Sequence, residues 1–385
     1  MKKNIVMILV ILLILTGGFF LGIFYQKISE KQSNTPKLVT KAPESTKKPR
    51  EKEMPEIQEE KSKVLIGYVQ DFRDPSAIDY KELTHVIFSF AHPTKDGSIL
   101  MNGETAKTNL KTMVKKAHEH QTKVLLAVGG WYHIEGGESY DYFKAAISNN
   151  TSRRKLVDEL IHLTKAENLD GIDIDFEHPR SNEDAKNLSI FIKALDEKLS
   201  KLNKELTIAV YSKIHSAAGT EIQSVVYDPN MFKHVDYVYI MAYDGQWDGE
   251  YNAANLSPYS FAENIVTYWS TLFDHLNIAK NKLVLGVPFY AQPENISINQ
   301  MSYGAIVEEN PENAQRDSVK LNGTTYHYNG IQTMLKKTNL AVDNGFGGMM
   351  IWELGHDVSG DYSLTSTISN ELAKKDEQQS IFARK

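Results

Sequence analysis

A short acidic run holds the residues best suited to chemistry in this sequence: Asp170-Gly-Ile-Asp173-Ile-Asp175-Phe-Glu177. Side chains alternate along a strand, so Asp173, Asp175 and Glu177 would share one face and the apolar residues between them the other. Such neighbours lie about 6–7 Å apart, and at an effective dielectric constant of 20 each ionised pair would repel by about 2–2.5 kcal/mol. We therefore expect raised pKa values, with some of these carboxyl groups protonated at neutral pH.

A carboxylic acid that keeps its proton at neutral pH can donate that proton to a leaving oxygen, as cleavage of a glycosidic bond requires. A metal site is the first alternative, although no histidine or further oxygen ligand lies in obvious register with the acids. A purely structural acidic cluster is the second alternative. No GxSxG, HExxH or P-loop motif indicates another reaction class. We expect neither a metal nor a cofactor.

Short apolar runs separated by amphipathic segments would position these acids. The runs predicted as strands are 64–69, 85–91, 123–128, 170–176, 206–211, 235–242, 283–290 and 346–352. The segments predicted as helices are 76–83, 104–120, 140–167, 182–202, 261–276, 328–344 and part of 363–375. This alternation implies a parallel sheet covered by helices.

Eight such units in one domain favour an α/β fold of the (β/α)8 TIM-barrel type. A doubly wound sheet is the alternative, but no Gly-rich dinucleotide turn follows the first strand. In a barrel, the reactive residues should lie at the C-terminal ends of the strands. Between strands seven and eight, residues 292–326 form an insertion in which Asn322-Gly323 separates two β-prone runs, a hairpin signal. We predict a small lobe at the rim of the site, with a plain surface loop as the alternative.

The chain ends differ in composition from this body. Residues 5–25 are uncharged and long enough to span a bilayer as a helix. No Ala-x-Ala-like site follows them, so residues 1–25 are predicted as a signal-anchor rather than a cleaved signal peptide. Residues 26–62 are rich in Lys, Glu, Pro, Ser and Thr, which predicts a disordered linker. The catalytic barrel would span 63–376 and a flexible tail 377–385, on the extracellular face of the membrane or secreted.

The overall composition excludes several function classes. Because the chain has 0 cysteines, it can form no disulfide, thiolate metal site or cysteine nucleophile. Its formal net charge of −6 lacks the basic excess that nucleic-acid-binding proteins usually show. The hydrophobic content of 41% and charged content of 24% are typical of a soluble globular body.

The acidic run resembles the signature of glycoside hydrolase family 18, the chitinase family. Its four acids have the spacing Asp170-x-x-Asp173-x-Asp175-x-Glu177. Other segments that resemble family elements are Gly129-Gly130 (S-x-G-G), Met241-Ala-Tyr243-Asp244 (M-x-Y-D), Gly286-Val-Pro-Phe-Tyr290 (G-x-P-x-Y) and Trp352. The resemblance covers about 63–375, and each motif falls at the end of a predicted strand.

The resemblance implies a retaining glycoside hydrolase that cleaves β-1,4-linked N-acetylglucosamine polymers. In this family the substrate's own 2-acetamido oxygen attacks the anomeric carbon, and no enzyme carboxylate is the nucleophile. Glu177 would be the general acid and then the general base. Asp175 would hold the acetamido N–H, and Asp173 would share a proton with Asp175. Tyr243 would donate its hydroxyl to the acetamido carbonyl.

The resemblance also implies a sugar-binding surface around these residues. Its expected members are Asp244, Trp352, Tyr290, Met241, Tyr68, Phe90, Gly130 and Trp131. Trp352 would form the floor of the pocket, and Trp131 would stack on a more distant sugar. Ala127 departs from the family pattern, because S-x-G-G has Ser there. We expect that loss to alter the pH dependence rather than abolish activity.

Other readings of the same chemistry stay open. The substrate could be peptidoglycan or an N-glycan core instead of chitin, and the protein is expected to act as a monomer without nucleic acid. A non-catalytic, lectin-like chitin-binding barrel is a further alternative. Glu177 argues against it, because binding alone does not need a proton donor.

Overall fold

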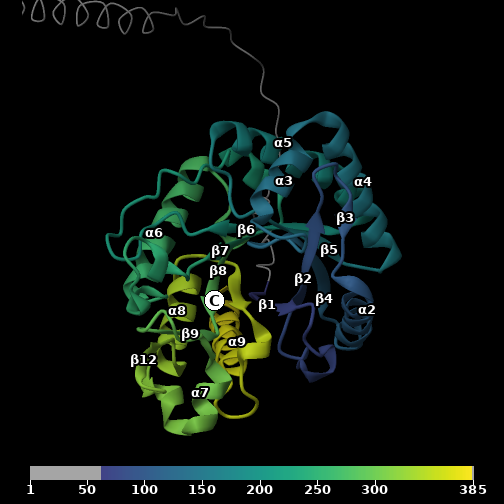
Figure 1. Cartoon of the computed structure of the whole chain (residues 1–385). Helices are drawn as coiled ribbons and strands as arrows, with labels where there is room; N and C mark the ends of the chain where they lie inside the picture. The colour runs from purple at the N-terminus through teal and green to yellow at the C-terminus, as the bar shows by residue number, and fades with distance from the viewer. Residues whose placement is uncertain (1–61, 384–385) are drawn as a thin grey trace, which may run out of the picture. The chain divides into compact units, whose positions relative to one another are not determined.

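The computed structural model describes residues 62–383, in which parallel strands close into a barrel (Figure 1). The barrel strands are β1 (Val64–Gln70), β2 (His85–Pro93), β4 (Lys123–Gly129), β5 (Gly171–Asp175), β6 (Glu205–Tyr211), β7 (Tyr237–Met241), β8 (Leu283–Pro288) and β13 (Gly348–Trp352). They pair in the order β1-β13-β8-β7-β6-β5-β4-β2, and pairing of β1 with β2 closes the ring. The predicted (β/α)8 barrel is therefore confirmed.

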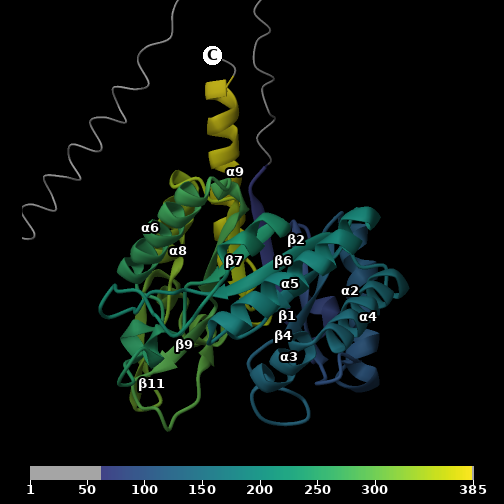
Figure 2. The same cartoon turned by 90° about the horizontal axis from the view of Figure 1, so that it is seen from above.

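The helices that follow the strands lie outside the ring, as the two views in Figures 1 and 2 show. They are α2 (Gly103–Glu119), α3 (Ser139–Ser148), α4 (Asn150–Ala166), α5 (Asn182–Leu199), α6 (Tyr259–Leu276), α8 (Ile331–Asp343) and α9 (Leu364–Ala383). Between β6 and β7, a short 3-10 helix at Pro229–His234 takes the place of an α-helix. A two-residue strand, β3 (Ile99–Leu100), pairs antiparallel with the end of β2.

The apolar side chains of the strands divide into two cores. Ile172, Ile174 and Phe176 belong to the large cluster between the barrel and its helices. Ala127 and Tyr68 belong to a smaller cluster inside the barrel. This division follows the two-residue alternation of a strand. Asp173 and Asp175, which alternate with these apolar residues, therefore lie on the inner face of the barrel, as predicted.

The insertion after β8 forms the small lobe that the sequence predicts. Its sheet has the order β10-β9-β12-β11, built from β9 (Tyr290–Pro293), β10 (Met301–Ser302), β11 (Ser318–Leu321) and β12 (Thr324–His327). A short helix, α7 (Tyr303–Glu309), completes the lobe, drawn in light green in Figure 1. Asn322 and Gly323 both have positive φ, as a two-residue hairpin turn of type I′ requires.

Two helix predictions need correction. Residues 76–83 form no α-helix, and only Pro75–Ala77 makes a 3-10 turn. The Asp79 carboxylate accepts a hydrogen bond from the backbone N–H two residues on, a local bond that competes with helix formation. The single helix predicted at 140–167 is two helices, because Asn149 is extended and its side chain accepts hydrogen bonds from the N–H groups of Thr151 and Ser152 in the first turn of α4.

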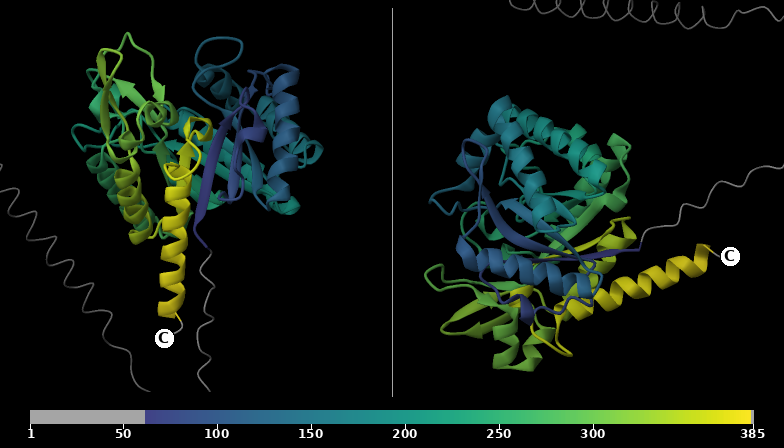
Figure 3. Two further views of the ribbon diagram at one scale, coloured as in Figure 1. Left: turned by 90° about the horizontal axis from the view of Figure 1, so that it is seen from below. Right: turned by 90° about the vertical axis from the view of Figure 1, so that its right-hand side faces the viewer.

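Residues 377–383, which we expected to be part of a flexible tail, continue the helix α9, which ends at Ala383. No Gly or Pro interrupts 366–383, so nothing in the covalent chain stops the helix. The Asp376 carboxylate accepts a hydrogen bond from the Lys63 N–H at 3.0 Å, and Figure 3 shows α9 beside the start of β1.

The predicted signal-anchor and most of the predicted linker lie outside the described residues. Within 62–383, the helices contain no apolar stretch of the length that a membrane span requires.

Candidate active site

Three acids, two on β5 and Glu177 just after it, form a column that becomes more accessible toward the C-terminal end of the strand. Asp173 is fully buried, Asp175 is 3% exposed, and Glu177 is partly open to solvent. The residues of the other motifs follow the same ends of β4, β7, β8 and β13. The site therefore lies where the barrel prediction placed it.

Two hydroxyl groups hold the deepest acid. The Tyr68 hydroxyl donates to Oδ2 of Asp173 at 2.5 Å, and the Thr207 hydroxyl donates to Oδ1 at 2.6 Å. Burial raises the pKa of Asp173 to about 6, and these two donors oppose the rise. Asp173 thus bonds to hydroxyls here rather than to Asp175, and the proton shared by the two acids stays a prediction. The sequence prediction omits Thr207, although a hydroxyl at an inward position of an apolar strand was an available signal.

The upper two acids carry raised pKa values. Burial raises the pKa of Asp175, and the charges of Glu177 and Asp173 raise it further. Although Glu177 is partly accessible, desolvation by the surrounding protein raises its pKa to about 8, with a further contribution from Asp244. Within the described residues, Oδ1 of Asp175 is buried and has no hydrogen-bond partner. The column therefore offers a protonated acid, Glu177, next to a buried carboxyl group, Asp175, that has one unpaired oxygen.

Tyr243 and Asp244, just after β7, form the wall that faces this column. Burial raises the pKa of Tyr243, and the charges of Asp175, Asp244, Glu177 and Asp173 raise it further, so its phenol remains a hydrogen-bond donor. The Tyr290 hydroxyl donates to Oδ1 of Asp244 at 2.5 Å, and the Gln246 amide donates to the same oxygen at 2.9 Å. Met241, partly buried, packs against the inner core.

Aromatic rings line the bottom and one edge of the site. Trp352 is partly exposed, and its ring stacks on Phe90 with centroids 5.8 Å apart. The ring centroid of Tyr68 lies 5.5 Å from that of Trp352, but Tyr68 is only 1% exposed, so it supports Trp352 from below the sugar-binding surface in which we expected it. Trp131 is 40% exposed beyond the end of β4, with its ring 6.5 Å from that of His178.

Gly129 and Gly130 allow the ends of β4 and β5 to approach each other. The Gly130 N–H donates to the Asp175 carbonyl at 2.9 Å. A Cβ on Gly129 would lie 2.1 Å from the same carbonyl oxygen, and one on Gly130 would lie 2.9 Å from the Phe90 ring. Both glycines have positive φ. Gly130 is buried with its N–H already bonded, so it positions neighbours rather than presenting the binding surface that we expected.

An ion pair between a buried glutamate and a partly exposed arginine holds the segment that follows Trp352. The Glu353 carboxylate is fully buried, pairs with Arg73 and lies 3.3 Å from Nε2 of His356. Its second oxygen accepts a hydrogen bond from the Gly355 N–H at 3.0 Å. The sequence prediction missed Arg73, because no local signal relates residues 280 positions apart.

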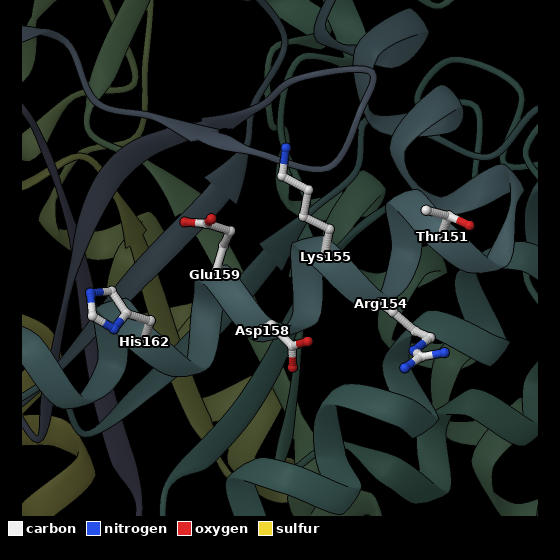
Figure 4. A pocket seen from close by; sticks show the side chains of 6 residues that line it. All are labelled: Thr151, Arg154, Lys155, Asp158, Glu159 and His162. Carbon is white, nitrogen blue, oxygen red and sulfur yellow. The ribbon is translucent and has the colours of Figure 1, made fainter.

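A hollow of about 730 Å³ elsewhere on the surface lies along the outer helix α4 (Figure 4). Its lining residues are Thr151, Arg154, Lys155, Asp158, Glu159 and His162. All come from one helix, and their side chains point in different directions rather than converging. In the described part of the chain, no three His, Asp or Glu side chains are grouped so that they could hold a metal ion. The strand ends therefore remain the candidate site.

Comparison with solved structures supports the same fold. A family 18 chitinase from the chitin utilization locus of Flavobacterium johnsoniae matches with a TM-score of 0.68 and 25% identity, covering 82% of this chain and 95% of that one. A chitinase from Bacteroides thetaiotaomicron matches at 0.67 and 26%, covering 81% and 97%. A chitinase-like agglutinin from Robinia pseudoacacia matches at 0.66 and 19%, covering 80% and 99%, so the fold alone does not separate enzymes from lectins.

Comparison of sequences identifies the family. The chain is 26% identical over 377 residues to Chitinase 1 of Aphanocladium album, covering 81% of this chain and 84% of the relative. The model for glycosyl hydrolases family 18 matches residues 64–357, which include every strand of the barrel. The chain therefore belongs to glycosyl hydrolase family 18 and is a glycosidase.

Proposed function

We propose that this protein cleaves β-1,4-linked N-acetylglucosamine polymers of the chitin type, with retention and by substrate-assisted catalysis. The observation that carries the proposal is the state of Glu177, an accessible acid whose pKa is raised to about 8 above a buried acidic column. Beside it stand the unpaired oxygen of Asp175 and the phenol of Tyr243. Relatives of this chain are named chitinases, which supports chitin as the substrate class.

In the first step, Glu177 donates its proton to the glycosidic oxygen while the bond from that oxygen to C1 breaks. The acetamido carbonyl oxygen of the same sugar attacks C1 and forms an oxazolinium ion. Asp175 accepts a hydrogen bond from the acetamido N–H, and its charge stabilises the developing cation. In the second step, the Glu177 carboxylate takes a proton from water while that water attacks C1. The bond from C1 to the acetamido oxygen breaks, so the acetamido group is restored and the product is the β-anomer.

The remaining wall residues orient the sugar in this scheme. The Tyr243 hydroxyl donates to the acetamido carbonyl oxygen, and Asp244 binds the acetamido group or a ring hydroxyl. Trp352 lies under the apolar face of the reacting sugar, and Tyr290 keeps Asp244 in place through its 2.5 Å hydrogen bond. Trp131 offers an exposed ring to a sugar further along the chain.

Replacing Tyr243 by phenylalanine should therefore lower turnover more than binding. Loss of one preorganised donor to a developing charge costs about 10²–10³ in kcat, and we expect KM to change by less than about threefold. Steady-state kinetics on chitin oligosaccharides would measure both constants. Tyr132→Phe, at a tyrosine that is 73% exposed, is the matched control and should be unaffected. Unchanged kcat in Tyr243→Phe would remove Tyr243 from the mechanism.

The substrate class is tested by giving the protein chitin oligosaccharides, peptidoglycan and an N-linked glycopeptide in parallel. We expect hydrolysis of the chitin oligosaccharides, with the β-anomer appearing first in ¹H NMR spectra of the products. An α-anomer formed first would exclude retention. Hydrolysis of only one of the other two polymers would reassign the substrate, and binding without hydrolysis of any would favour a lectin.

We also propose that the apolar segment 1–25 anchors the protein and that 26–62 is a spacer, with the barrel outside the cell. The uncharged run at 5–25 and the polar composition after it support this arrangement. Fractionation of cells into membrane, soluble and medium fractions would test it, and recovery of the full-length chain in the soluble cell fraction would contradict it.

A further inference from the structure

The deepest acid receives its hydroxyl donors from an asymmetric set of strands. In the register of the barrel, Asp173 lies between Ala127 of β4 and Thr207 of β6. Ala127 belongs to the inner core and has no hydroxyl, whereas the Thr207 hydroxyl donates to Oδ1 of Asp173 at 2.6 Å. The Tyr68 hydroxyl, from β1, donates to Oδ2. Each oxygen of Asp173 therefore has one hydroxyl donor.

We propose that Thr207 is a positioning residue for the reaction, which holds Asp173 ionised and correctly oriented from β6. Its side chain is fully buried, so it acts through Asp173 and not on the sugar. The proposal rests on the proposed function and adds a residue to it. Its hydroxyl donates a hydrogen bond to Asp173 from β6, whereas Ala127 on β4 has no hydroxyl to donate one from the opposite side.

The charge of Asp173 matters because of what lies above it. An ionised Asp173 raises the proton affinity of Asp175. It also adds to the negative field that favours a cation at the sugar. Burial raises the pKa of Asp173, and the hydrogen bond from Thr207 lowers that pKa more than any other contact does. Without that hydroxyl, Asp173 would keep its proton to higher pH. In that pH range a neutral Asp173 would no longer raise the proton affinity of Asp175 or add to the negative field at the sugar.

Of the other titratable groups that face Asp173 in the described part of the chain, the three tyrosines do not titrate in the acidic range, and Asp175 is the only one that is an acid. Tyr68 from β1, Tyr239 from β7 and Tyr243 after β7 all have pKa values raised by burial and by the charge of Asp173, so they stay neutral. Asp175 on the same strand is the remaining acid. The acidic limb of the pH profile is the fall of kcat/KM toward low pH. A shift of this limb therefore reports on the protonation of the acids in the column.

The test compares Thr207→Val, which keeps the side-chain shape without the hydroxyl, with Thr207→Ser, which keeps the hydroxyl. Loss of one hydrogen bond to the carboxylate should move the acidic limb of kcat/KM to higher pH by about one unit. At a pH below that limb, kcat/KM should then be about tenfold lower, with KM unchanged. Thr207→Ser should retain the limb. Thr164→Val, which removes a fully buried threonine hydroxyl from α4, is the matched control and should also retain it.

A double variant separates the donor from simple packing. Ala127 occupies the level of Asp173 on β4, so Ala127→Ser combined with Thr207→Val should return a donor from the opposite strand and restore the limb. If Thr207→Val does not fold, Thr207→Ala with and without Ala127→Ser gives the same comparison. A native acidic limb in Thr207→Val, or a loss that neither serine variant reverses, would overturn the proposal.

A second measurement does not depend on turnover. ¹³C NMR titration of the Asp173 carboxyl, assigned by comparison with Asp173→Asn, should show its pKa raised by about one unit in Thr207→Val. If the wild-type protein is inactive but Thr207→Val shows the shift, the proposed function is contradicted while the hydrogen bond from Thr207 to Asp173 is supported. If the wild-type protein is active but Thr207→Val shows no shift, the role of Thr207 is contradicted while the proposed function stands.

Discussion

Replacing Glu177 by glutamine is expected to lower kcat on chitin oligosaccharides by about 10³–10⁴, because general acid catalysis by a positioned side chain contributes up to that amount. Glutamine keeps the size of the side chain but has no proton to give to the leaving oxygen. Binding should persist, since the other groups around the site remain. Isothermal titration with a chitin oligosaccharide and single-turnover kinetics would measure the two effects separately.

The pH dependence of the wild-type protein provides a second view of the same group. Burial raises the pKa of Glu177 to about 8, so the acid is protonated below that pH and ionised above it. Its proton is thus available at neutral pH, and kcat/KM should fall as the pH rises through about 8. Glu159→Gln on the outer helix α4 is the matched control and should leave rate and profile unchanged. Turnover in Glu177→Gln within tenfold of wild type would show that Glu177 is not the general acid.

Replacing Asp175 by asparagine tests the second acid of the column. Asp175 has an unpaired buried oxygen. In the proposed mechanism its carboxylate accepts a hydrogen bond from the acetamido N–H, and its charge stabilises the oxazolinium ion. An amide of the same size removes that charge and can present an N–H to the acetamido N–H. We expect kcat to fall by about 10²–10³, as when one preorganised electrostatic group is removed.

A thiazoline analogue of the oxazolinium ion makes this test specific. If Asp175 stabilises the cation rather than the bound substrate, Asp175→Asn should weaken binding of the analogue in parallel with kcat and leave substrate binding nearly unchanged. Asp158→Asn, on the exposed face of α4, controls for the loss of one surface charge. Equal weakening of analogue and substrate would instead make Asp175 a ground-state binding residue.

Much of the site was predictable because it depends on local covalent geometry. Alternation along one strand places Asp173, Asp175 and Glu177 on a common face, and like charges so close together raise their pKa values in any fold that buries them. The eight apolar runs, the hairpin at Asn322-Gly323 and the reactive strand ends of a barrel follow from equally local patterns.

Other features required contacts that sequence spacing does not contain. The bond from Thr207 to Asp173 exists because β6 pairs with β5 in one register, and the ion pair of Arg73 with Glu353 joins residues 280 positions apart. Tyr68, expected in the sugar-binding surface, is buried against Trp352 and supports that ring. Gly130 was also expected in the sugar-binding surface, but its N–H donates to the Asp175 carbonyl at the neighbouring strand end.

The sequence alone determined which side chains carry the chemistry and on which face of β5 they lie, because strand alternation is a property of the backbone itself. The tertiary structure decided how strongly each acid holds its proton and which hydroxyls support it. Desolvation and hydrogen bonding across strands arise only when the ring closes and fixes the register of neighbouring strands.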